Sequence, residues 1–321
     1  MKFLGVDFDY YFENYPDKNG KFGKYGGYLG ELKKDILDEM AESYKEMLVS
    51  EEFKTMQERM KRWRNAMPSP FVLLNEFSDG DVKIYAKLKR SNSLGATPCN
   101  GQAFLAKYMD KSRIVASAED GVAAVSASGF SRIPCEVIVN PEISGRMFIS
   151  KIKVMGGYVI ETDGDPGEVA LKIANEDSEN TFLYQSSAIS SHPYPTIIRD
   201  YTKQAGTEAF KQYFELEKEL PTAVITAAGK GEASVGFISA FTNIFTDIVA
   251  VNPEGEIPEL MFLNDLERIR FAEADETEAV KIKDRLKKLE GIKTDLKGAA
   301  ALAYAVKYAE KLEKGNIIVN L

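Results

Sequence analysis

Few side chains in this chain have the types and spacing that metal binding or nucleophilic catalysis requires. His192 is the only histidine, and the two cysteines, Cys99 and Cys135, lie far apart in the sequence. Zinc sites need several cysteine or histidine ligands, and Ser-His-Asp or Cys-His arrangements need a histidine base beside the nucleophile. We therefore expect no metal site, and the composition argues against these hydrolytic arrangements.

The remaining candidates each allow a functional and a structural interpretation. Thr97-Pro98-Cys99 predicts an N-cap, a proline at the first helical position and a thiol in the first turn. That location lowers a thiol pKa, so Cys99 is a candidate nucleophile or redox thiol. For His192 the structural alternative is a residue that fixes a turn, and Cys135 stands in an apolar run typical of a core strand.

The elements that must position these residues alternate between short β-rich runs and helical stretches. Amphipathic spacing predicts helices from about 31 to 47 and from 52 to 63, and two strands follow at 71–74 and 82–88. Alternating strands and helices predict parallel sheets flanked by helices, hence an α/β fold. The further β-rich runs are 114–117, 135–139, 157–160, 181–184, 223–226 and 247–251.

Composition places the protein among ordinary globular proteins. A chain of 321 residues favours two lobes, and no apolar stretch reaches the roughly 18 residues of a membrane span. The N-terminus lacks a signal-peptide core and only two cysteines occur, so we expect a cytoplasmic protein. The net charge of −8, with basic residues interleaved among acids, argues against nucleic-acid binding.

Several motifs resemble the tryptophan synthase β chain in sequence and in order. The run 20–27, GKFGKYGG, resembles the G-x-F-G-x-F-G-G opening of that family, and 192–200, HPYPTIIRD, resembles its H-P-Y-P-T-x-x-R-[DE] segment. Further similar segments, again in the family's order, are 68–70, 87–90, 101–107, 113–116, 301–305 and 317–321. The resemblance therefore covers nearly the whole chain.

The resemblance implies the two-lobed fold of type II pyridoxal-phosphate enzymes, with a cleft between the lobes. We expect one lobe to hold 1–65 and 100–200 and the other to hold 66–99 and 201–321. Ligands in such sheets bind at the carboxyl ends of strands. The predicted cleft residues are Ser117, Glu119, Asp120, His192, Gly229, Lys230, Gly231, Glu232 and Ser234.

Two departures from the family concern the cofactor directly. The family's cofactor lysine aligns with Cys99 or Asn100, depending on the gap, and neither side chain can form an imine. The family's glycine-rich phosphate loop aligns with 229–233, where Glu232 brings a carboxylate beside the expected phosphate. Lys230 is a candidate counter-charge for it. We therefore expect no pyridoxal phosphate and no other cofactor.

Three more departures fall in the same predicted cleft. The family's catalytic loop is shortened to 117–121, and its acids Glu119 and Asp120 favour a cationic or hydroxyl-bearing ligand over a carboxylate. The glutamate expected after I-P-A-L aligns with Lys297, and the sequence stops at Leu321 before the family's S-G-R-G-D turn. The cleft is therefore expected to be acidic.

These observations leave three hypotheses for function. The first is a non-catalytic binding or partner subunit, with a homodimer expected from the family and a homologous or small partner subunit as alternatives. The second is an enzyme with new cofactor-independent chemistry, using Glu119, Asp120 and Glu232 as acids and bases and Cys99 as a nucleophile. The third is a lyase or synthase using non-covalently bound pyridoxal phosphate. The shortened stretch from 253 to 268 argues against pairing with a standard α chain.

Overall fold

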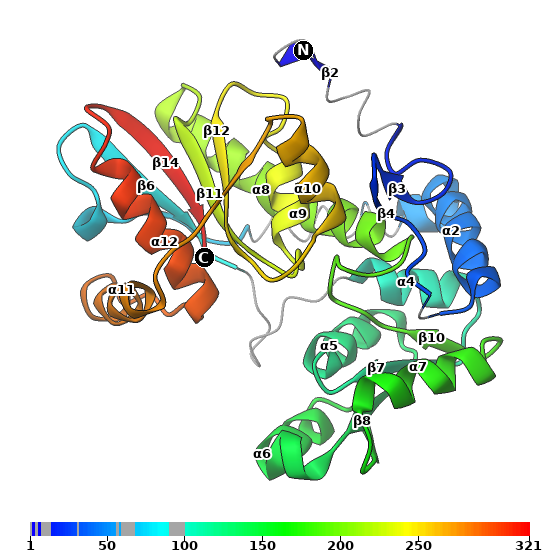
Figure 1. The fold of residues 1–321 in the computed structure, drawn as a ribbon. Helices are drawn as coiled ribbons and strands as arrows, with labels where there is room; N and C mark the ends of the chain where they lie inside the picture. Colours follow the sequence, from blue (N-terminus) through cyan, green and yellow to red (C-terminus); the bar gives the residue numbers. More distant parts are fainter. Residues whose placement is uncertain are drawn as a thin grey trace. The chain divides into compact units, whose positions relative to one another are not determined.

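The protein forms two compact units, each built around a sheet of its own. The computed structural model describes residues 2–3, 6–7, 14–30, 32–55, 58, 68–89 and 100–321 (Figure 1). Unit 1 comprises Met1–Gly26, Met67–Arg90 and Thr202–Leu321, and unit 2 comprises Gly27–Ala66 and Ser91–Tyr201.

This division differs from the expected lobes at the start of the chain, where Met1–Gly26 belongs to unit 1. The hairpin of β3 (Lys21–Phe22) and β4 (Tyr25–Gly26) explains the difference, because it packs against α10 (Pro258–Asp265). The ring of Phe262 on α10 leaves no room for a side chain at Gly23. A contact between residues more than 200 positions apart, which the sequence does not reveal, therefore assigns this segment to its unit.

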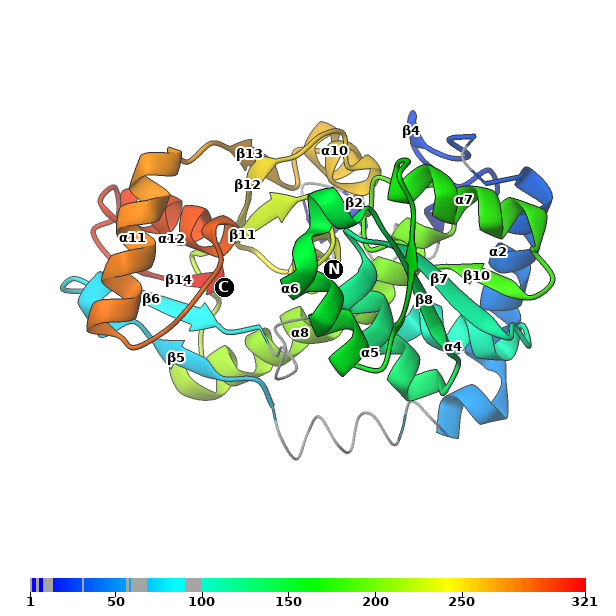
Figure 2. The ribbon, with the colours of Figure 1, turned by 90° about the horizontal axis from the view of Figure 1, so that it is seen from below.

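Unit 1 contains a six-stranded sheet in the order β13-β12-β11-β14-β6-β5 (Figure 2). All neighbouring strands run parallel except β5, which pairs antiparallel with β6 at the edge. The central strands are apolar along their length because helices cover both faces of a parallel sheet. The strands are β5 (Phe71–Leu73), β6 (Val82–Lys87), β11 (Ala223–Gly229), β12 (Asp247–Pro253), β13 (Arg270–Ala272) and β14 (Gly315–Asn320).

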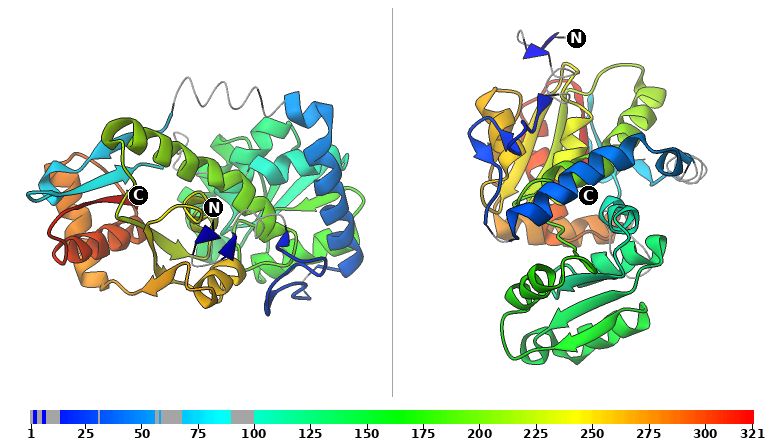
Figure 3. Two further views of the ribbon diagram at one scale, coloured as in Figure 1. Left: turned by 90° about the horizontal axis from the view of Figure 1, so that it is seen from above. Right: turned by 90° about the vertical axis from the view of Figure 1, so that its right-hand side faces the viewer.

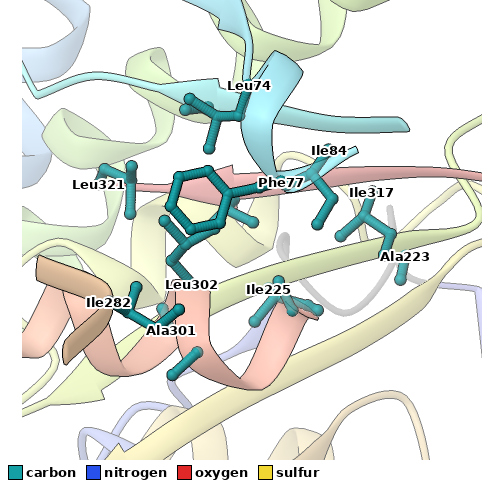
Figure 4. Packing of buried hydrophobic residues seen from close by; sticks show 14 of the residues in the cluster. Leu74, Phe77, Ile84, Ala223, Ile225, Ile282, Ala301, Leu302, Ile317 and Leu321 are labelled. Carbon is teal, nitrogen blue, oxygen red and sulfur yellow. The ribbon is translucent and has the colours of Figure 1, made fainter. Parts of the chain in front are cut away.

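The main apolar core of unit 1 lies between one face of this sheet and two helices, α11 (Glu276–Leu289) and α12 (Leu296–Ala309). Figure 4 shows Leu302 and Ile282 of these helices among side chains from alternate positions of the strands. The start of α12 lies close to the end of β14, since a Cβ built on Gly298 would be 3.5 Å from the α-carbon of Leu321, which also joins the core.

The opposite face of the same sheet is covered by α8 (Tyr194–Glu217), whose later part belongs to unit 1. Here Lys87 of β6 is 1% exposed, and its Nζ donates to Glu208 at 2.6 Å and to Gln212 at 2.6 Å. A buried ammonium needs such partners, since an unpaired charge is costly away from water. Lys87 is therefore a structural residue.

Unit 2 contains a parallel four-stranded sheet in the order β10-β7-β8-β9 (Figure 3). Its strands are β7 (Arg113–Ser117), β8 (Cys135–Val139), β9 (Tyr158–Glu161) and β10 (Thr181–Leu183). The crossover helices α5 (Gly121–Ser131), α6 (Pro141–Val154) and α7 (Pro166–Glu176) connect them, and α2 (Lys34–Val49) and α4 (Asn100–Tyr108) complete the unit.

The predicted α/β fold is confirmed, and each β-rich run identified in the sequence forms a strand. The three-residue strand β13 was not predicted, because a short edge strand has no clear periodicity. Of the predicted helix 52–63, residues 52–55 and 58 are helical, and the rest lies outside the described residues. No helix in the described parts of the chain is both long and apolar enough to cross a membrane.

Candidate functional site

The loop 229–233 joins the carboxyl end of β11 to α9 (Ser234–Ser239) in unit 1. Gly229 and Gly231 both have positive φ, +52° and +88°, a region that favours glycine. The turn is closed by Ala228, whose carbonyl accepts from the Gly231 N–H at 2.9 Å and from the Ser234 hydroxyl at 2.9 Å. The loop therefore has the shape expected of an anion cradle at the end of a parallel strand.

A carboxylate of the chain itself occupies this cradle. Glu232 Oε2 accepts from the Lys230 backbone N–H at 3.0 Å, and Glu232 Oε1 lies 3.3 Å from Lys297 Nζ. Lys297 lies in the first turn of α12 and also contacts Glu254 Oε1 at 2.9 Å. Glu254 follows β12, and its N–H donates to the Gly229 carbonyl at 2.8 Å. We refer to Glu232, Glu254 and Lys297 as the Glu232 cluster.

The electrostatics of the Glu232 cluster follow from partial exposure and two carboxylates around one ammonium. The side chains of Glu232, Glu254 and Lys297 are 37%, 43% and 42% exposed. Partial burial disfavours the charged ammonium, but the hydrogen bond to Glu254 and the charge of Glu232 outweigh it and raise the pKa of Lys297. Lys297 therefore stays protonated at neutral pH and holds both acids.

A second carboxylate sits at the carboxyl end of β7 in unit 2. Asp120 Oδ1 accepts from the Ser186 backbone N–H at 3.0 Å and also from the Ser186 hydroxyl. The Asp120 N–H donates to the Ser117 carbonyl at 3.2 Å, just before α5 begins. The neighbouring Glu119 is exposed. Asp120 thus ties the loop after β7 to the loop after β10.

A reciprocal amide pair reinforces the loop that carries Ser186. The Gln185 N–H donates to Gln102 Oε1 at 3.0 Å, and Gln102 Nε2 donates back to the Gln185 carbonyl at 2.5 Å. Gln102 lies on α4, where Gly101 is also required, because a Cβ there would come within 2.3 Å of the Tyr201 ring. The Gly-Gln pair of the family motif 101–107 therefore has a packing role.

Of the two residues aligned with the family lysine, Asn100 is the first described residue of α4. Its Oδ1 is buried and, within the described part of the chain, has no hydrogen-bond donor. Cys99 lies outside the described residues, so the thiol hypothesis is neither supported nor opposed. Cys135 is a core residue on β8, and burial raises the pKa of its thiol to about 12.

His192 lies in unit 2, beside Gly27, the last residue of the first family motif, and the two residues that follow it. Its backbone N–H donates to the Gly27 carbonyl at 3.0 Å, and its ring meets Tyr28 edge-on with 6.2 Å between centroids. The adjacent Ser191 hydroxyl accepts from the Leu29 N–H at 2.8 Å. These contacts join the start of the 192–200 segment to residues 27–29 at the end of the first motif, which fits the structural interpretation of His192.

The predicted cleft residues thus form two groups. In unit 1, the loop from Gly229 to Glu232 and the first residue of α9, Ser234, form one group. In unit 2, Ser117, Glu119 and Asp120 form the other, and His192 belongs to unit 2 but to neither loop. Their convergence on a single cleft stays a prediction. No local pattern indicates that Lys297, Glu254 and Ser186 are the partners of the two carboxylates, because each lies 22 to 66 residues away along the chain.

Other features of the described residues do not add to these two loops. No group of three or more histidine, cysteine or acidic side chains is arranged there to hold a metal ion. A groove of about 640 Å³ runs along α11 and α12, with Glu278, Arg285 and Tyr304 among its lining residues. Its lining contains none of the candidate site residues named from the sequence.

Comparison with known proteins identifies the class to which this fold and these loops belong. A model of the family described as pyridoxal-phosphate dependent enzyme matches residues 63–268. The chain belongs to the pyridoxal-phosphate dependent enzyme family.

Within that family the chain is similar to tryptophan synthase β chains along nearly its whole length. It is 26% identical to the tryptophan synthase beta chain of Clostridium botulinum, with 98% of this chain and 94% of that protein covered. It is also 26% identical to tryptophan synthase beta chain 1 of Wolinella succinogenes, with 97% and 94% covered. A crystal structure of a lysine-to-alanine mutant of O-ureido-L-serine synthase, with O-ureido-L-serine bound, matches with a TM-score of 0.61. At 17% identity, covering 79% of this chain and 87% of that one, it supports the fold alone.

These comparisons correct one expectation. We expected no cofactor, and that expectation is wrong, because the family is pyridoxal-phosphate dependent and the similarity to its members covers almost the whole chain. The missing lysine alone does not exclude the cofactor, since family membership points to pyridoxal phosphate whether or not a lysine anchors it.

The loop 229–233, as the structure describes it, does not fit the phosphate of that cofactor. Glu232 takes the Lys230 N–H and one contact of Lys297, both of which an anion would use. A Cβ built on Gly229 would lie 2.9 Å from Glu232 Oε2 and 3.2 Å from Lys297 Nζ, so these side chains fill the space over the loop. A phosphate group requires that Glu232 first move away.

Proposed function

We propose that this protein is a tryptophan synthase β-like subunit that does not form the lysine-linked cofactor adduct and acts as a binding or partner subunit. The observation that carries the proposal is the amide of Asn100 at the start of α4, one of the two positions aligned with the family lysine. An amide nitrogen is not nucleophilic and forms no imine. Any pyridoxal phosphate that binds is then held non-covalently.

Reduction with borohydride tests this proposal directly, because it fixes an imine as a stable secondary amine. The wild-type chain, incubated with pyridoxal phosphate and reduced, should show no saturable absorbance band and no dominant modified lysine in peptide mapping. Matched controls are Asn100→Lys and Cys99→Lys, each of which places an amine at one aligned position. A single lysine of the wild-type chain that is fixed stoichiometrically at low cofactor concentration would overturn the proposal.

The alternative of new acid–base chemistry has less support from the contacts of its acids. Asp120 accepts two hydrogen bonds from Ser186, and Glu232 is shared between a backbone N–H and Lys297. A general base must be able to reach a substrate proton, and carboxylates with these partners are poorly placed for that role. Glu119 alone of the three is exposed.

A second copy of the chain is the partner that we propose, since a homodimer is the expectation from the resemblance to tryptophan synthase β chains. Light scattering on the purified chain should give twice the mass of one chain. A monomeric mass at micromolar concentration would contradict this part of the proposal and leave a different protein as the partner.

A further inference from the structure

We propose that Glu232 is a built-in competitor of phosphate, so that a phosphate monoester binds the loop 229–233 only when the Glu232 carboxylate is displaced. The inference deepens the proposed function, on which it rests, by assigning a ligand class to this loop. It starts from the disagreement between a phosphate-dependent family and a cradle that already contains a carboxylate.

The contacts of Glu232 match those of a bound anion. One carboxylate oxygen accepts from the Lys230 N–H at 3.0 Å, while the other faces Lys297 Nζ at 3.3 Å. An amide N–H in a glycine-rich turn and a lysine ammonium are the usual partners of a phosphate group. Glu232 therefore satisfies the donors for which a phosphate would compete.

The hold on Glu232 is weak enough to be broken. Its side chain is 37% exposed, so water can replace the lost hydrogen bonds when it swings out. Its contact with Lys297 is longer than the 2.9 Å contact between Lys297 and Glu254. Lys297 therefore keeps a partner when Glu232 leaves, and its ammonium stays beside the vacated loop.

Glycine geometry keeps the competition local to this loop. Gly229 has positive φ, and its α-carbon faces Glu232 Oε2 and Lys297 Nζ. Because glycine has no side chain, nothing at position 229 stands between the backbone of the loop and these two groups. A phosphate oxygen would meet the same two groups. Because it would also meet the Glu232 carboxylate, which repels it, binding and displacement are coupled.

The size of the effect follows from the fraction of molecules in which the loop is open. A ligand that binds only an open form present in one molecule of ten has an apparent affinity about tenfold below its intrinsic affinity. For an open fraction of about one in ten, removing the carboxylate should tighten phosphate binding by about tenfold. Glu232→Ser removes the carboxylate and shortens the side chain, whereas Glu232→Gln removes the negative charge and keeps the length and shape of the side chain.

Calorimetric titration with inorganic phosphate and, separately, with pyridoxal phosphate tests the inference. Glu232→Ser should bind both probes at least about tenfold more tightly than the wild-type chain. The affinity of Glu232→Gln for both probes should lie between those of the wild-type chain and Glu232→Ser. The matched control is Glu254→Gln, which removes the other partner of Lys297, leaves the Lys230 N–H capped and should not tighten binding.

Two further measurements make the outcome decisive. Adding Lys297→Met to Glu232→Ser should remove most of the gain, because the phosphate then loses its ammonium partner, and matching melting curves show that each variant folds. Equal affinities of the wild-type chain and Glu232→Ser, or an equal gain in Glu254→Gln, would overturn the inference. A tighter response to pyridoxal phosphate but not to phosphate would also overturn it, since the gain would then lie outside the loop. A lysine adduct in the wild-type chain would overturn only the proposed function.

Discussion

The loops 117–121 in unit 2 and 229–233 in unit 1 place a carboxylate at the same kind of position and hold it in different ways. Each follows the carboxyl end of a parallel strand. Asp120 is held by the neutral donors of Ser186, whereas Glu232 is held by one backbone N–H of its own loop and by the ammonium of Lys297. The first carboxylate joins two loops, and the second fills one loop.

The difference separates two uses of a buried or half-buried acid. A carboxylate that satisfies the N–H of another segment contributes to the fold, because its loss leaves that donor without an acceptor. A carboxylate over its own loop, paired with a partly exposed lysine, contributes little to stability and can be exchanged for another anion. Sequence alone assigned both acids to one acidic cleft without this distinction.

The largest effect should come from removing the carboxylate that joins two loops. Asp120→Ala should lower the free energy of unfolding by about 2 kcal/mol, the usual cost of losing hydrogen bonds to a charged acceptor. Glu232→Gln should cost about 0.5 kcal/mol or less, since exposed ion pairs contribute little. Urea denaturation of both variants measures the difference.

Glu119→Ala is the control for the Asp120 variant, because Glu119 is the adjacent residue and is exposed. Its unfolding free energy should stay within about 0.5 kcal/mol of the wild-type value. If Glu232→Gln loses as much stability as Asp120→Ala, the contrast between the two loops is wrong.

A smaller effect concerns alkaline pH. Because the folded-state pKa of Lys297 lies above its ordinary value of 10.5, its ion pairs stabilise fully below pH 10.5 and are lost as the pH rises through the raised value. Lys297→Arg keeps its charge in this range. Melting curves between about pH 9 and pH 12 should show the wild-type chain losing a few tenths of a kcal/mol more than this variant. If the stability of the two proteins depends on pH in the same way, Lys297 is not the group that titrates.

The sequence predicted those parts of the fold that depend on local pattern. The apolar runs 223–226 and 247–251 form β11 and β12, because residues buried on both faces of a parallel sheet leave a continuous apolar signal. Strand β13 was not predicted, since Arg270-Phe271-Ala272 is too short to show a β-strand periodicity. The placement of Met1–Gly26 in unit 1 depends on contacts with α10 that no local pattern encodes.

The sequence predicted which residues belong to the candidate site but not which of them contact each other. The alignment indicated Glu232 and Lys297 as two separate departures from the family. The structure brings them within 3.3 Å, so they are one coupled pair. Their pairing depends on where the core packing places the first turn of α12, and 65 residues separate them along the chain. Acidic and basic residues separated by this many positions are too common in a sequence for the separation to identify an ion pair.

The position of β14 also has a consequence for the timing of folding. Residues 315–320 form a strand in the interior of the sheet, between β11 and β6, which come from segments made much earlier. During synthesis, β11 and β6 lack their shared neighbour until β14 emerges from the ribosome. The segments of unit 2 are complete by Tyr201, so unit 2 can fold first, while the sheet of unit 1 cannot be completed before β14 has been made.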